Sequence, residues 1–214
     1  MSASEEPRER TLELDRVVNF SDAVFAIAAT LLVLNVSFSL KLEPPDLDRK
    51  LWREFGDVFP QILAYVLSFF IIARNWLGHH RMFKIIHRID GTLISLNLVL
   101  LGLIALVPFP TEVYGNYPGD RPALIIYCIA ISAPSLVGAA LFMYAAKDNR
   151  LTDPSTPRDW VVHSHLRALS IPVVFLTSIP VSFIAVPLAQ AWWALLIPIR
   201  IVFTRRYGKI TDIW

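Results

Sequence analysis

The chain has 214 residues, of which 55% are hydrophobic and only 18% charged, and its net charge is +2. This composition is too apolar for a surface exposed to water and favours the lipid bilayer as the solvent. The basic residues lie between apolar stretches and form no patch, which excludes nucleic acid as a partner. With Cys128 as the one cysteine, an intramolecular disulfide is also excluded.

Six apolar stretches suit membrane-spanning helices. Such a helix needs roughly 20 apolar residues, because the hydrocarbon core is about 30 Å thick and each residue rises about 1.5 Å. The sequence therefore predicts an all-α membrane protein with six transmembrane helices per subunit. The last stretch is short and closely follows Pro187, so we expect the fifth and sixth to form a tight hairpin. The predicted spans are Val17–Phe38, Val58–Leu77, Thr92–Phe109, Ala123–Ala146, Leu166–Val186 and Leu188–Phe203.

Charged residues at the ends of the spans predict the orientation. We expect a cytoplasmic segment over residues 1–16, a transmembrane domain over residues 17–204 and a cytoplasmic tail over residues 205–214. The first span is expected to be retained, since no signal-peptide cleavage site follows it. The positive-inside rule then places both termini in the cytoplasm. Only five of the 20 Lys and Arg residues fall on the other side, namely Lys41, Arg49, Lys50, Arg53 and Arg121.

The segment before the second span is expected to be an amphipathic helix. Apolar residues recur there at helical spacing, with charged residues between them, after a pair of prolines. The simplest role for it is a surface helix that covers the outer rim and leads into the second span. The apolar residues are Leu47, Leu51, Phe55 and Val58, and the prolines are Pro44 and Pro45.

The first span carries the most informative motif. Arg16, Phe20, Ser21 and Asp22 form the pattern Arg-x-x-x-Phe-Ser-Asp, and a helix rich in Ala, Ile, Thr and Leu follows. This pattern resembles the transmembrane protein 175 family of endolysosomal potassium channels and their prokaryotic relatives. The segment NWLGHHRMF, residues 75–83, resembles the Trp and His segment of the same family. With one copy of the motif and six spans, the chain is similar to the prokaryotic single-repeat form.

The resemblance implies a potassium-permeable cation channel in which K⁺ is the permeant ion and no cofactor is needed. In that family the first helix lines the pore, and a ring of isoleucines forms its narrowest hydrophobic constriction. The matching residue here is Ile27, with Leu31 and Leu34 as the next layers and Thr30 beside them. Because two-repeat relatives pair to give four first helices, the resemblance implies a homotetramer in a prokaryotic plasma membrane.

The angular positions of the residues divide the first helix into two faces. At about 100° per residue, small or modest side chains gather on one face, where another helix could approach closely. Bulky apolar side chains gather on the opposite face. The residues alone place this face against lipid or in a protein core, whereas the resemblance places it at the pore. The bulky residues are Phe20, Ile27, Leu31, Leu34 and Phe38, and the opposite face holds Asp22, Ala26, Ala29 and Val33.

An acid at the start of a span is costly unless it is paired. Asp22 could cap the helix N-terminus, where the macrodipole favours a carboxylate. The alternative is a buried hydrogen-bond network that supports the pore helices next to the pore, the role that the family's motif suggests. That network would join Arg16, Phe20, Ser21 and Asp22 to Asn75, Trp76 and His79.

Other functions have little support in the sequence. Adjacent His79 and His80 point to different helix faces, so we expect no metal site. Motifs of hydrolases, metalloproteases and phosphate-binding loops are missing, so we expect no enzyme, and the T-V-G-Y-G potassium filter is missing too. Two alternatives to a channel stay open: a non-conducting scaffold, or a secondary transporter in which Asn35 and Asn97 converge on a closed cavity.

Overall fold

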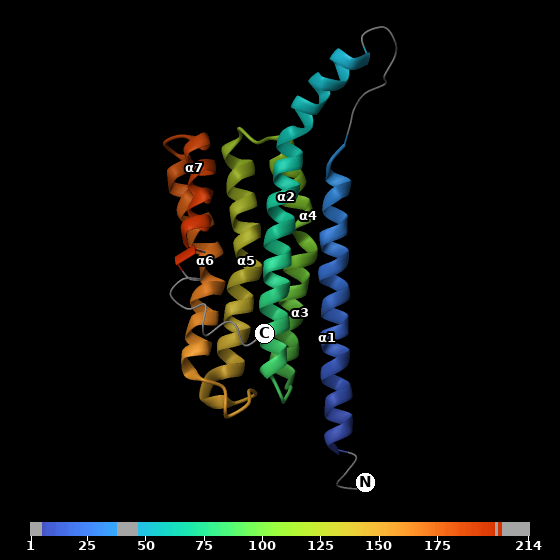
Figure 1. Cartoon of the computed structure of the whole chain (residues 1–214), viewed down its shortest axis with the longest axis vertical. Helices are drawn as coiled ribbons and strands as arrows, with labels where there is room; N and C mark the ends of the chain where they lie inside the picture. The colour runs from blue at the N-terminus through green and yellow to red at the C-terminus, as the bar shows by residue number, and fades with distance from the viewer. Residues whose placement is uncertain (1–5, 38–46, 200, 203–214) are drawn as a thin grey trace.

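The computed structural model describes residues 6–37, 47–199 and 201–202. Over these residues the chain is a bundle of roughly parallel and antiparallel helices (Figure 1). Its elements are α1 (Glu6–Leu31), η1 (Leu32–Asn35), α2 (Leu47–Ile85), α3 (Gly91–Leu106), α4 (Pro108–Asn116), α5 (Arg121–Ala146), η2 (Lys147–Asn149), α6 (Arg158–Ser182), α7 (Val186–Trp192) and η3 (Trp193–Leu195).

Among the described residues, five helical segments are long and apolar enough to cross a membrane, in agreement with the predicted multi-pass helical membrane protein. The sixth predicted span falls on a shorter apolar helix, Val186–Ile199, so a sixth crossing stays a prediction. Phe38, Phe203 and the predicted tail, residues 205–214, lie outside the described residues. The five segments are Leu12–Asn35, Leu51–Ile85, Gly91–Asn116, Arg121–Asn149 and Arg158–Ser182.

The third span ends later than predicted, at Asn116 instead of Phe109. Val107 keeps helical angles of φ −52° and ψ −38°, and Pro108 occupies the first turn of α4. Proline is tolerated in a first turn because the N–H it lacks would have had no intrahelical partner. α3 and α4 therefore continue one another, and the proline marks a joint within the span.

α2 is one continuous helix of 39 residues that contains Pro60. It begins at Leu47, which confirms the helical extension predicted before the second span. The first turns of α2 project past the rest of the bundle (Figure 1). Trp52 and Phe55 are exposed on this projecting part.

Two apolar clusters hold the helices together. The larger one centres on α5, which packs against α2, α3, α4 and α6. There the fully buried Tyr127 ring contacts the rings of Tyr114, Phe175 and Trp193. A second cluster, which includes Phe83, joins the end of α2 to α3, α5 and α6.

The α2–α3 and α5–α6 loops pair with each other, and we call residues 86–90 and 149–157 the clasp. An antiparallel bridge joins Ile86 to Thr152, and the His87 N–H donates to the Leu151 carbonyl at 2.9 Å. Asp148 and Asn149 adopt left-handed angles at the turn that ends α5. Both loops lie at the end of the bundle where α1 begins (Figure 1). The start of α1 and these two loops, all expected on the cytoplasmic side, are thus found at the same end. We call this the clasp end.

Candidate pore helix and its polar contacts

α1 has one buried side and one exposed side. Ser21, Phe25 and Ala28 of α1, and Leu32 of the η1 turn that continues it to Asn35, are at most 2% exposed and pack toward the bundle; below, α1 includes this turn. The predicted bulky face is open instead, with exposed fractions of 57% at Ile27, 42% at Leu31 and 71% at Leu34, and Phe20 is exposed as well. α1 stands at one edge of the bundle (Figure 1), so this apolar face has no covering helix within the described chain.

The predicted close-packing face of α1 makes only part of the contacts of this helix within the chain. Ala26 and Val33 are exposed, whereas Asp22 and Ala29 are only half-buried. The buried side lies about a quarter turn from both predicted faces, at 100° per residue. It combines large and small side chains, so residue size alone did not reveal it.

Two hydrogen-bonded branches tie α1 to α2 and α3. In the first, the Trp76 indole Nε1–H donates to Asp22 Oδ1 at 2.8 Å. In the second, Asn97 Nδ2 donates to Ser21 Oγ at 3.0 Å, and His79 Nε2 lies 2.9 Å from Asn97 Oδ1. Ser21, His79 and Asn97 are all buried, so in an apolar setting each bond also avoids the cost of an unsatisfied polar group.

The ring of His79 is held in place by aromatic packing. It stacks on Phe83 with centroids 4.3 Å apart and lies 5.5 Å from the Phe25 ring on α1. The bond to the Asn97 carbonyl oxygen requires a proton on Nε2. Nδ1 is buried and has no hydrogen-bond partner among the described residues, which suits the acceptor nitrogen of a neutral imidazole.

The structure brings together four of the seven residues expected in the network: Ser21, Asp22, Trp76 and His79. The other three lie elsewhere in the described part of the chain. Arg16 and Phe20 are exposed and make no side-chain hydrogen bond to these four, and Asn75 faces α5, where it accepts from Ser135 Oγ at 3.0 Å.

Sequence reasoning did not assign Asn97 to the network. Its signal was an amide inside an apolar span, which the sequence suggested as a carrier residue. In the structure this amide binds Ser21 and His79, whereas Asn35 Nδ2 donates to the Pro108 carbonyl near the other end of α1. The two amides therefore do not converge on one cavity.

Thr30 lies on the exposed side of α1. Its hydroxyl is 3.0 Å from the Ala26 carbonyl and 2.9 Å from the Ile27 carbonyl, both on its own helix. The proton is therefore used within the helix, while the lone pairs of the oxygen stay available on the exposed face. No group of three or more metal-ligating side chains occurs in the part of the chain that the structure describes.

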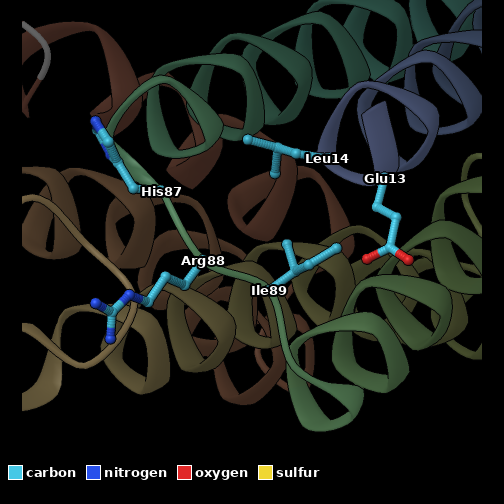
Figure 2. Close-up of a pocket in the computed structure, with 5 residues that line it drawn as sticks. All are labelled: Glu13, Leu14, His87, Arg88 and Ile89. Atoms are coloured by element: carbon cyan, nitrogen blue, oxygen red, sulfur yellow. The ribbon is translucent and has the colours of Figure 1, made fainter. Parts of the chain in front are cut away.

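A surface hollow of about 260 Å³ lies between α1 and the clasp (Figure 2). Glu13 and Leu14 line it from α1, and His87, Arg88 and Ile89 line it from the clasp. In Figure 2 the Arg88 and His87 side chains point away from the Glu13 carboxylate. The charged groups thus do not converge on a ligand.

The chain is built of long apolar helices that a few buried polar contacts join, and one side of the first helix is uncovered. These features define a multi-pass helical membrane protein. Residues 16–108 match the family described as "Endosomal/lysosomal potassium channel TMEM175". A potassium channel of Streptomyces collinus is 32% identical over 86% of this chain and 89% of its own length. A potassium channel of Chamaesiphon minutus is 34% identical over 81% of this chain and 86% of its own.

A solved structure has the same fold. It is the crystal structure of a lysosomal potassium-selective channel TMEM175 homolog from Chamaesiphon minutus, with a TM-score of 0.71 and 30% identity. The match covers 91% of this chain and 97% of that one. The chain belongs to the TMEM175 family.

Proposed function

We propose that the chain is a potassium channel that conducts passively through a central pore lined by α1. The observation that carries the proposal is the open apolar face of α1 at Ile27, Leu31 and Leu34, on a helix whose other side is buried. Two relatives that match over most of their length are named potassium channels, which supports K⁺ as the permeant ion.

A homotetramer would complete the pore. One α1 cannot enclose a path for ions, and rotational symmetry would set one copy of each exposed residue around a shared axis. In the proposed tetramer the Ile27 side chains form the narrowest ring, and Leu31 and Leu34 form the next layers. The exposed Ala26 and Val33 would then be available to contact a neighbouring α1.

The constriction would act as both gate and sieve. A narrow ring of branched apolar side chains excludes water, so a passing ion must shed hydration without a fixed charge to compensate. The width of the ring therefore sets how much of its hydration shell an ion must shed, and K⁺, which is hydrated less strongly than Na⁺, loses less free energy in the passage. The Thr30 oxygen, one turn away, offers lone pairs to an ion near the ring.

The proposed setting is a prokaryotic plasma membrane with the clasp end in the cytoplasm. This orientation puts the basic residues around the clasp, such as Arg88 and Arg150, on the inner side. Both termini would then be cytoplasmic, with the short helix Val186–Ile199 as part of a sixth crossing.

The separate partners of Asn35 and Asn97 weigh against a secondary transporter, since a carrier would gather such amides in one midplane site. A non-conducting scaffold is distinguished by function, because it carries no ions. Purified protein reconstituted in liposomes loaded with K⁺ therefore provides the test, and no K⁺ flux above that of empty liposomes would contradict a channel.

Substitutions on the open face test the path of the pore. Ile27→Asn adds amides that wet the constriction, so we expect a larger K⁺ flux and weaker discrimination between K⁺ and Na⁺. Leu31→Ala should act in the same direction but more mildly. Val33→Ala, outside the proposed constriction, is the control and should keep the selectivity of the parent. If Ile27→Asn conducts and discriminates like the parent, the pore does not run along this face.

A further inference from the structure

Asp90 joins three elements at the clasp end. Its Oδ1 accepts from the Leu93 N–H at 2.8 Å, which caps the start of α3. Its Oδ2 accepts from the Tyr144 hydroxyl of α5 at 2.6 Å and lies 3.5 Å from Arg150 Nη2 in the clasp. The Arg150 guanidinium in turn lies over the Tyr144 ring, 4.9 Å from its centroid. One carboxylate thus ties the start of α3 to α5 and to the α5–α6 loop.

From this geometry we propose that Asp90 is a positioning residue for the pore helix. It fixes the rotation and height of α3, and α3 fixes α1 through Asn97. Within the channel function proposed above, Asp90 would thereby influence how the Ile27 face is presented to the pore, although it does not touch α1.

The route from Asp90 to α1 runs along one side of α3. Asn97 follows Asp90 by seven residues, which is close to two helical turns, so both lie on the same side of the helix. A shift of the start of α3 therefore displaces the Asn97 amide in the same direction. Asn97 Nδ2 is bonded to Ser21 Oγ, and Ser21 precedes Ile27 by less than two turns of α1.

Leu14, Val17 and Val18 of α1 also pack against the apolar cluster that contains Ile86 and Leu151 of the clasp, and the hydrogen-bonded route through α3 acts beside this packing. The hollow beside Glu13 and Leu14 separates α1 from His87 and Arg88 (Figure 2). In the half of the bundle near the clasp, two side-chain hydrogen bonds join α1 to other helices among the described residues. They are Ser21–Asn97 and Asp22–Trp76. One of the two depends on the placement of α3.

Replacing Asp90 with asparagine separates its proposed role in positioning α1 from its role as the cap of α3. Asn caps a helix N-terminus about as well as Asp does, so Asp90→Asn keeps the bond to the Leu93 N–H. It removes the negative charge that faces Tyr144 and Arg150. Asp120 is the matched control, because it caps α5 in the same way, with its side chain 3.1 Å from the Ala123 N–H, at the opposite end of the bundle.

The experiment compares Asp90→Asn, Tyr144→Phe and Asp120→Asn with the parent in liposomes. Amide hydrogen exchange of α1 residues 17–27 and K⁺ flux are both measured. We expect Asp90→Asn and Tyr144→Phe each to speed exchange in this segment about fivefold, the factor that the net loss of one hydrogen bond produces. K⁺ flux should change in the same direction in both, and the double variant should resemble either single one. Asp120→Asn should match the parent in both measurements.

The inference is overturned if exchange rises only in the first turn of α3, while α1 residues 17–27 exchange as in the parent. If Asp90→Asn does not fold, Tyr144→Phe decides, since it leaves the cap of α3 in place. If the parent chain carries no K⁺, the proposed function is contradicted. The amide hydrogen exchange of α1 would still decide the role of Asp90.

Discussion

α1 and α5 contain equally apolar stretches but differ in packing. Both helices are 26 residues long, and the most apolar 18-residue stretch has a mean hydropathy of 2.1 in each of the spans Leu12–Asn35 and Arg121–Asn149. Yet 50% of the most apolar part of the α5 span is buried in the chain, compared with 22% for the α1 span. Hydropathy therefore places both helices in the membrane, but it does not tell which one meets protein and which one meets lipid, water or another subunit.

The largest expected effect tests this contrast directly. Ile131 of α5 is fully buried and Ile27 of α1 is exposed, so the same substitution can be compared at both. Ile131→Ala should lower the free energy of unfolding by about 2–5 kcal/mol, because it leaves a cavity. Ile27→Ala should cost less than about 1 kcal/mol. Unfolding in detergent followed by circular dichroism measures both, and equal losses would mean that the Ile27 face is packed.

The second prediction concerns the side of α1 that does meet protein. Asp22→Ala leaves the Trp76 indole N–H without its acceptor, so we expect a loss of about 1–3 kcal/mol in the free energy of unfolding. Asp15→Ala, at an exposed site on the same helix, is the control and should be close to neutral. Selectivity for K⁺ should move less than stability, since Asp22 lies away from the constriction. Parental stability and parental flux in Asp22→Ala would argue against the network.

The smallest expected effect is a dependence on pH at the clasp. The Tyr144 hydroxyl, together with the Leu93 N–H and Arg150, holds the pKa of Asp90 below its ordinary range. A lowered pKa in the folded state stabilises the fold above the ordinary carboxyl pKa, and this contribution is lost as pH falls through the lowered value. Tyr144→Phe removes the largest cause, so it should be less stable than the parent at neutral pH.

The difference between Tyr144→Phe and the parent should then shrink toward zero once the pH falls below both pKa values. Thermal melting between pH 3 and pH 7 would measure it. Tyr117→Phe, at an exposed site far from the clasp, serves as control and should show the same difference from the parent at every pH. A gap between Tyr144→Phe and the parent that stays constant with pH would indicate that the hydroxyl acts only through packing.

Much of the fold could be predicted from the sequence, because long apolar runs give the spanning helices directly. The spacing of Ile27, Leu31 and Leu34 also gave the bulky face of the first span, but it left open whether this face meets lipid or a protein core. The buried side was not predicted, since a helical wheel gives angles between residues but not the direction of the neighbouring helices. The third span was predicted to end at Phe109, although the place of Pro108 in a first turn lets the helix continue to Asn116.

The polar contacts were predicted only where a residue type was unusual for its place. Asp22 and Trp76 stood out in an apolar setting, and the structure joins them. Asp90 and Tyr144 are 54 residues apart and are ordinary residues for a loop and a helix end, so no pattern links them. Their contact depends on how α3 and α5 pack, which the sequence does not state.

The contacts of α1 also have a consequence for the order of biosynthesis. Trp76 and Asn97 follow Asp22 and Ser21 by 54 and 76 residues, so α1 leaves the ribosome well before its partners exist. At about 5–20 residues per second, the wait for Asn97 is roughly 4–15 s. In the folded chain the Ser21 hydroxyl donates to the Val17 carbonyl at 2.7 Å, a bond within α1 that can therefore form before α3 has been made.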